Sequence, residues 1–289
     1  MFFGTVVKPR YDTEQILFIL NIIMNTINKP YIFVIGNEKG GAGKTTCCMH
    51  LIIALLYQNC SVVSIDTDSR QGSLTSYLKN RDLYNQQNPD KAVLVPKHFH
   101  ISEGEIEEQA KHFEQVLKNN PDADYIVIDT PGSHTPLSRV AHSYADTIIT
   151  PINDSFLDLD VIATIDSNDE IISPSIYSQM IWEQKMERAS RDKISIDWVI
   201  LRNRLSNLDA LNKRRVGNVL AKLAKRINFK LAEGFSERVI YRELFLQGLT
   251  LLDLKTAKYD RAFNSSHVLA RQELRNFLAF LGIKATFKG

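Results

Sequence analysis

A glycine-rich stretch at residues 37–46 constrains the fold of this chain more than any other part of its sequence. It reads Asn-Glu-Lys-Gly-Gly-Ala-Gly-Lys-Thr-Thr, follows the apolar run Tyr31–Ile35, and precedes an apolar segment, 47–57, that is typical of a buried helix. Glycines let the backbone point successive N–H groups at one anion, and a helix N-terminus adds partial positive charge. The pattern therefore predicts a strand, a phosphate-binding loop and a helix, in that order.

Individual residues of this stretch match the contacts that a bound nucleotide needs. Lys44 is expected to reach the β- and γ-phosphates, and the Thr45 hydroxyl is expected to ligate Mg²⁺. Glu38 stands where the general phosphate-loop pattern has its first glycine, so the match to that pattern is incomplete. The predicted nucleotide-binding residues of the loop are Gly40, Gly41, Ala42, Gly43, Lys44, Thr45 and Thr46.

Four further apolar runs, at residues 61–65, 125–128, 147–150 and 198–201, predict strands of the same sheet. Helical or polar segments separate these runs, which is typical of parallel strands joined by crossover helices. The expected fold is α/β, with a doubly wound, mostly parallel sheet and helices on both faces. In such sheets, ligands bind beyond the carboxyl ends of the strands, where the glycine-rich loop also lies.

Two stretches between the strands carry weaker signals. Residues 84–100 are rich in Asn, Gln and Pro and are expected to be a long surface connection or an insertion. Residues 102–119 have helical spacing, and Ser102 followed by Glu105 has the form of a capping box. The second stretch is therefore expected to be a helix that starts next to Ser102.

Composition and cysteine usage agree with a cytoplasmic protein. A chain of 289 residues that is 44% hydrophobic and 24% charged, with a net charge of +2, is ordinary for a globular domain. Cys47, Cys48 and Cys60 lack metal-binding spacing and provide no disulfide framework, so a reducing compartment is expected. No segment is long enough to cross a bilayer. Residues 29–289 are predicted to form a single domain.

Residues 1–28 are predicted to be a leader that precedes this domain. Within it, residues 16–23 are apolar except for Asn21, and the acidic residues Asp12 and Glu14 precede them, unlike a secretory signal. An amphipathic leader, a disordered leader and a true start at Met24 all agree with this pattern.

Aspartates at strand ends supply the expected metal and catalytic chemistry. Asp129 follows four apolar residues in the Walker B arrangement, in which the carboxylate orients the Mg²⁺ shell. It begins the sequence Asp-Thr-Pro-Gly, so the N–H of Gly132 is expected to approach a γ-phosphate. No acid follows Asp129 directly, so Asp68 is the expected acceptor for the attacking water, and hydrolysis should be slow. Asp66 is expected to support the metal or the loop, and loop capping is the alternative role for both residues.

A basic helix is predicted between residues 208 and 226. Its apolar stripe would face the core, and five cations gather on the adjacent arc of the helical wheel: Arg214, Arg215, Lys222, Lys225 and Arg226. Such a face could contact DNA phosphates without reading bases. An ordinary solvated surface is the alternative.

The loop and several longer segments resemble known ATPases. Lys-Gly-Gly-Ala-Gly-Lys-Thr, with its second lysine at Lys39, is similar to the deviant Walker A loop of ParA/MinD ATPases. Residues 36–44, 150–156, 198–205 and 238–245 resemble segments of the MipZ family, and the similarity extends over residues 30–281. This resemblance implies ATP and Mg²⁺ as cofactors.

The resemblance also implies a dimer and a set of partners. In the ParA/MinD class the signature lysine crosses a nucleotide sandwich dimer, which implies that Lys39 joins Lys44 and Asp68 in catalysis. The class uses an asparagine near the base, which implies that Asn203 contacts adenine, whose edge an amide can pair with. A simple turn residue is the alternative role for Asn203. A MipZ-type protein would bind DNA non-specifically as the ATP dimer, be recruited by ParB, inhibit FtsZ assembly, and associate with the nucleoid and the poles.

Three other functions fit the same motifs. The first is a ParA-type ATPase that partitions chromosomes or plasmids. The second is a metabolic enzyme of the same fold, such as a synthetase; a nitrogenase-type reductase is disfavoured because no cysteine is placed to bridge a cluster. The third is a nucleotide-gated binding module that never hydrolyses ATP.

Overall fold

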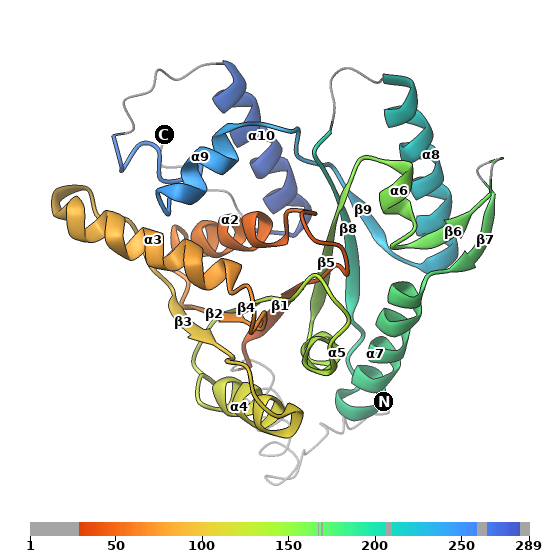
Figure 1. Ribbon diagram of the computed structural model, residues 1–289, viewed down its shortest axis with the longest axis horizontal. Coiled ribbons are helices and arrows are strands. Elements are labelled where there is room, and N and C mark those ends of the chain that lie inside the picture. Colours follow the sequence, from red (N-terminus) through yellow and green to blue (C-terminus); the bar gives the residue numbers. More distant parts are fainter. Residues whose placement is uncertain (1–28, 167, 169, 206–209, 259–264, 284–289) are drawn as a thin grey trace, which may run out of the picture.

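A seven-stranded sheet organises the part of the chain that the computed structural model describes, residues 29–283 without 167, 169, 206–209 and 259–264. The strand order is β3-β2-β4-β1-β5-β8-β9, and every neighbouring pair is parallel. Helices cover both faces of this sheet (Figure 1). The predicted doubly wound parallel sheet is therefore confirmed, with a separate antiparallel hairpin of β6 and β7 beside it.

The elements alternate along the chain as the sequence pattern predicts. The strands are β1 (Tyr31–Ile35), β2 (Val62–Asp66), β3 (Lys97–His100), β4 (Tyr125–Asp129), β5 (Thr147–Asn153), β6 (Ala163–Ile165), β7 (Ile171–Pro174), β8 (Asp197–Asn203) and β9 (Lys230–Ala232). The helices are α2 (Lys44–Leu56), α3 (Ser73–Gln87), the short 3₁₀ helix η1 (Pro89–Lys91), α4 (Ile106–Lys118), α5 (Pro136–Ser143), α6 (Phe156–Leu159), α7 (Ile176–Asp192), α8 (Ala210–Ile227), α9 (Ile240–Leu246) and α10 (Ser265–Phe280). None of these helices is long and apolar enough to span a membrane.

The strands are buried on both sides, so each contributes to two hydrophobic cores. Phe33 and Ile35 of β1 pack with α2, α3, α9 and α10, whereas Ile32 and Val34 pack with α4, α5, α7 and α8. This alternation follows from the period of two along a strand. It explains why the central strands read as continuous apolar runs, as parallel strands covered on both faces do.

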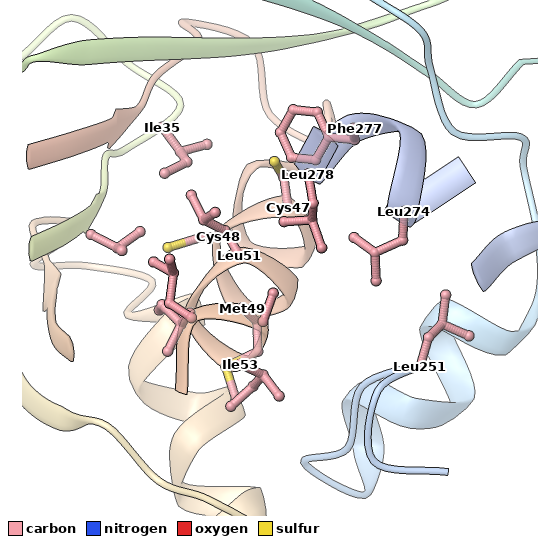
Figure 2. Close-up of a cluster of buried hydrophobic side chains, with 14 of the residues drawn as sticks. Ile35, Cys47, Cys48, Met49, Leu51, Ile53, Leu251, Leu274, Phe277 and Leu278 are labelled. Atoms are coloured by element: carbon pink, nitrogen blue, oxygen red, sulfur yellow. The ribbon is translucent and has the colours of Figure 1, made fainter. Parts of the chain in front are cut away.

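Helix α2 lies in the middle of the first core and is apolar around almost its whole circumference. Cys47 and Cys48 are buried in the cluster that also contains Leu251, and Cys47 lies beside Phe277 and Leu278 of α10 (Figure 2). Burial raises the pKa of both thiols, which keeps them protonated and unreactive. Because α2 starts directly after the glycine-rich loop, this packing fixes the loop to the sheet.

Two expectations about local structure are wrong. Residues 84–100 are not simply a surface connection: α3 continues to Gln87, and residues 97–100 form β3 at the sheet edge, paired with β2. An edge strand is half-buried, so its sequence lacks the apolar run that marks the central strands. The capping box is also absent, because α4 begins at Ile106 and its N-cap, Glu105, forms no side-chain capping bond.

Candidate functional site

The sheet topology brings the predicted site residues to one edge. Strand β4 lies between β1 and β2, and in the register of the sheet Asp129 is paired with both Ile35 and Asp66. The glycine-rich loop begins directly after β1. The ends of three neighbouring strands therefore surround the N-terminus of α2, as expected for a ligand site in a doubly wound sheet.

Backbone geometry explains the glycines of the loop. Gly41 and Gly43 have φ angles of 72° and 90°, in the left-handed region that favours glycine. At Gly43 a Cβ atom would also lie 2.2 Å from the Asn203 side-chain nitrogen, so no larger residue fits there. The loop opens into a cavity of about 440 Å³ that Asp68, Asp129 and Gly132 also line. This cavity, at a helix N-terminus, has the form of a phosphate site.

Lys44 lies at the base of this cavity and is 8% exposed. Its Nζ donates a hydrogen bond to the Lys39 carbonyl oxygen at 3.1 Å, which closes the loop on itself. Burial lowers the pKa of Lys44, while the nearby carboxylates of Asp129 and Asp68 raise it. The Lys44 ammonium group is thus held where it can form an ion pair with an anion in the cavity.

Thr45 and Asp129 form a pair that fits Mg²⁺. The Thr45 hydroxyl donates to Asp129 Oδ2 at 2.7 Å, whereas the buried Asp129 Oδ1 has no hydrogen-bond partner. Burial, together with the charge of Asp66, raises the pKa of Asp129 to about 7, so a cation here would favour its ionised form. Among the described residues no three His, Cys, Asp or Glu side chains converge on one point, and Mg²⁺ at such sites takes its other ligands from phosphates and water.

Asp66 and Asp68 have different surroundings. Asp66 is fully buried and accepts hydrogen bonds from the Asp68 N–H and from the Thr75 N–H and hydroxyl, at 2.9–3.0 Å. Asp68 is half-buried, lines the cavity, and accepts from the N–H groups of Arg70 and Gln71 through Oδ1 alone. Of the two roles predicted for Asp66, this geometry favours loop support over metal binding.

Gly132 lies against the glycine-rich loop. A Cβ atom at this position would approach Gly40 N to 3.1 Å and Gly40 Cα to 3.2 Å, so the two backbones are in close contact. Thr130 ties the start of the same segment to β1, because its N–H and its hydroxyl both donate to the Ile35 carbonyl. A backbone movement in the glycine-rich loop would therefore displace the segment 130–132, and the reverse also holds.

A second cavity, of about 380 Å³, adjoins the first and shares Gly43, Thr46, Arg204 and Phe245 with it. Asn203 lines this cavity, and its amide donates to the Ala42 carbonyl at 2.8 Å. The sequence assigned no role to the other wall, which α9 and the segment before it provide: Phe235, Ser236, Glu237, Arg238, Tyr241, Arg242, Phe245 and Leu246. The only sequence signal for that wall is the likeness of residues 238–245 to known ATPases.

The side chain of Lys39 does not contact the glycine-rich loop to which the residue belongs. Its Nζ donates to the Leu157 carbonyl and lies 3.3 Å from Asp158 Oδ1, both in α6. The Lys39 side chain is 39% exposed, so its charge is accessible from outside the chain. The two loop lysines therefore have different partners: Lys44 contacts the loop backbone, and Lys39 contacts α6.

The predicted basic face lies on α8, which begins at Ala210; Leu208 and Asp209 lie outside the described residues. All five cations of this face are exposed. Of the predicted apolar stripe, Val216, Val219, Leu220 and Leu223 are buried and Ile227 is half-buried. Arg215 stacks on the Phe156 ring at 4.9 Å, Lys222 pairs with Glu170 at 3.4 Å, and Arg226 donates to the Ile171 carbonyl. Three of the five cations therefore also contact neighbouring elements.

Phosphate loops of this kind, set between the first strand and helix of a parallel sheet, define the P-loop NTPases, and Lys39 is typical of their ParA/MinD-like members. A sequence model of the MipZ ATPases matches residues 31–285, so the chain belongs to the MipZ family and is an ATPase. No curated protein matches this sequence.

Several solved structures share the fold. An ATP complex of a McdA variant from Cyanothece has a TM-score of 0.59 at 16% identity, covering 89% of this chain and 98% of that one. A putative plasmid partition protein of Borrelia burgdorferi bound to AMPPNP has a TM-score of 0.55 at 20% identity, with 87% and 100% covered. The cell division protein MinD of Aquifex aeolicus has a TM-score of 0.54 at 18% identity, with 87% and 97% covered. Similarity at this level of identity establishes the fold.

Proposed function

We propose that this chain is a MipZ-type molecular switch that dimerises on ATP and regulates the placement of the division site. The observation that carries the proposal is the position of the Lys39 side chain, which contacts Leu157 and Asp158 of α6 instead of its own loop and is 39% exposed. A cation in that position serves a neighbouring subunit's nucleotide, as an arginine finger does. The active form is then a sandwich of two chains around two nucleotides.

Within each subunit the cavity residues take separate roles. Gly40, Gly41, Ala42, Gly43 and Thr46, together with Gly132, hold the phosphates through their backbone, and Lys44 neutralises them. Thr45 and Asp129 would hold Mg²⁺, which would neutralise charge on the phosphates, while Asp66 supports the loop that carries Asp68. Asp68 orients the attacking water, and Asn203 lies beside the base. Because no acid follows Asp129, hydrolysis is slow, as suits a timer.

The partners follow from the family. The ATP dimer would bind DNA non-specifically through the basic face of α8, be recruited by a ParB-like protein, and inhibit an FtsZ-like polymer. This cycle would place the protein in the cytoplasm, on the nucleoid and at the poles. The competing role is partition of chromosomes or plasmids, which the fold similarity to a plasmid partition protein favours.

An FtsZ assembly assay distinguishes a role in division-site placement from a role in partition. In a light-scattering assay with purified FtsZ, the ATP-bound protein is expected to lower the scattering plateau, whereas the protein without nucleotide should not. The Lys44→Ala variant is the matched control, since it removes the charge that holds the phosphates. An unchanged plateau with the ATP-bound protein would reject the division role and favour partition.

Removing charge from the basic face is expected to weaken DNA binding. Each lost phosphate contact lowers the slope of log K against log salt by about 0.9, so the Arg214→Ala, Lys222→Ala, Lys225→Ala triple variant should lose about 2 to 3 in slope. Fluorescence anisotropy of a labelled duplex across a salt series measures this. Lys111→Ala and Lys118→Ala on α4, which are also exposed, form the control. Equal slopes for both variants would mean that the α8 face is only solvated surface.

A further inference from the structure

The end of β8 is paired irregularly, and two consecutive side chains face one cavity there. The Phe235 N–H donates to the Arg202 carbonyl at 3.0 Å, and the Phe235 carbonyl accepts from the Leu205 N–H at 3.0 Å. Asn203 and Arg204 therefore lie together opposite the single residue Phe235, which is the arrangement of a β-bulge. In a regular strand consecutive side chains point to opposite faces of the sheet. Here Asn203 and Arg204 both line the second cavity, of about 380 Å³, which is called the base-side cavity below.

Arg204 has a backbone conformation that costs energy. Its φ angle is 51°, in the left-handed region that residues with a Cβ atom rarely adopt. The pairing after the bulge holds it there, because Leu205 forms a β-bridge with Ser236 and the Leu205 carbonyl accepts from the Glu237 N–H at 3.3 Å. Residues held in such conformations cluster at ligand sites, where the strain fixes the position of a side chain. The conformation of Arg204 therefore indicates a function for its side chain.

Arg204 is exposed and lies at the junction of the two cavities, with the three other residues that line both: Gly43, Thr46 and Phe245. Two further arginines, Arg238 and Arg242, line only the base-side cavity. Each of them forms an ion pair, with Glu273 at 2.7 Å and with Glu237 at 3.5 Å, respectively. Of these three arginines, Arg204 is therefore the one placed to contact a phosphate group.

The α-phosphate is the part of a nucleotide that belongs at this junction. In a phosphate loop the backbone N–H groups cradle the α- and β-phosphates, and the lysine reaches the β- and γ-phosphates. The α-phosphate carries the sugar and the base, so it is the phosphate nearest to the base-side cavity. A guanidinium group can donate two parallel N–H bonds to the oxygens of one phosphate.

We propose that Arg204 binds the α-phosphate of the nucleotide in its own subunit. The inference rests on the proposed function, which places the phosphates in the first cavity and the base in the second. The bulge then has a specific effect, because it directs an amide and a cation from consecutive positions toward the same nucleotide.

Arg204→Ala is expected to weaken the binding of ADP and of ATP equally, by about tenfold, because both nucleotides carry the α-phosphate. Fluorescence of MANT-labelled ADP measures the affinity for ADP, and competition against it measures the affinity for ATP. The ATP measurement is made in a Lys39→Ala background, so that dimerisation does not contribute. Arg275→Ala, on α10 and outside both cavities, is the control and should bind as the unaltered chain does. Unchanged affinities in Arg204→Ala, or a larger loss for ATP than for ADP, would overturn the proposal.

Two other substitutions of Arg204 separate a phosphate contact from its alternatives. Arg204→Lys keeps a cation that binds phosphate but lacks a planar group that stacks on a base, so it should recover most of the affinity for ADP. An affinity as low as that of Arg204→Ala would assign the side chain to the base and overturn the proposal. Arg204→Gly should bind ADP as weakly as Arg204→Ala, yet unfold at a temperature about 2 to 4 °C higher, because glycine relieves the left-handed conformation. A glycine variant with the affinity of the unaltered chain would show that alanine only disturbs the bulge, and would also overturn the proposal.

Lys44→Ala shows separately whether the nucleotide lies where the proposed function places it. This variant should lose affinity for ADP, because it removes the cation of the phosphate cavity. If Lys44→Ala binds ADP as tightly as the unaltered chain, the proposed function fails together with this inference. If Lys44→Ala loses affinity and Arg204→Ala does not, only the role of Arg204 is overturned.

Discussion

Replacing Lys39 with alanine is expected to abolish the ATP-dependent dimer and to lower kcat by about three orders of magnitude, as loss of an arginine finger does. The variant should still bind ATP as a monomer, because Lys39 Nζ contacts α6 whereas Lys44 lines the phosphate cavity of its own chain. Size-exclusion chromatography with light scattering, without nucleotide, with ADP and with a non-hydrolysable ATP analogue, measures the dimer. Phosphate release measures kcat.

Asp158→Ala is the matched control for this experiment. It removes the carboxylate that pairs with Lys39 but leaves the lysine available to a partner, so the dimer should form at least as readily as in the unaltered chain. A Lys39→Ala protein that dimerises normally would contradict the sandwich arrangement. A variant that loses ATP affinity as a monomer would instead show that Lys39 serves its own subunit.

Replacing Asp68 with asparagine is expected to lower kcat by about 10²- to 10⁴-fold, the usual contribution of a positioned acid–base group. ATP binding should persist and the dimer should accumulate, because hydrolysis is the step that would release it. Asparagine keeps an oxygen that can accept the N–H groups of Arg70 and Gln71, so the turn after β2 is preserved. Single-turnover phosphate release and light scattering measure the two effects.

Asp68→Ala separates chemistry from structure at this position. It removes both the charge and the acceptor that holds the turn, whereas Asp68→Asn removes only the charge. Equal loss of hydrolysis with retained dimers in both variants assigns Asp68 to the attacking water. If Asp68→Ala abolishes the dimer while Asp68→Asn behaves normally, the residue acts as a loop cap and another group must position the water.

Local patterns predicted the elements that carry the phosphate site. The run before the glycine-rich loop, the glycines and the start of α2 all have strong local signals, because left-handed φ angles and full burial restrict which residues can stand there. Strand β3 and the α4 N-terminus had no such signal. Lys97–His100 is half-buried at an edge, and the backbone at Ser102 is simply not yet helical.

The base-side cavity could not be predicted from the sequence in the same way. Its second wall comes from Phe235 and from α9, more than 180 positions after the glycine-rich loop, and only the packing of that segment against α2 and β8 brings it to the site. No spacing rule relates residues that far apart. The resemblance to the MipZ family covered residues 238–245 but did not indicate which residues they contact.

The sequence by itself determined the parallel sheet, the phosphate loop and the chemical types of the residues around it, because strand burial and loop geometry are set by neighbouring residues. The tertiary structure alone decided which way each charge points. In the folded chain Asp66 is buried and accepts a hydrogen bond from Thr75, and Asp129 Oδ1 has no hydrogen-bond partner. Lys39 forms an ion pair with Asp158 of α6. Those orientations depend on which strands and helices are neighbours in space. The order of the strands in the sheet determines these neighbours, and sequence spacing does not.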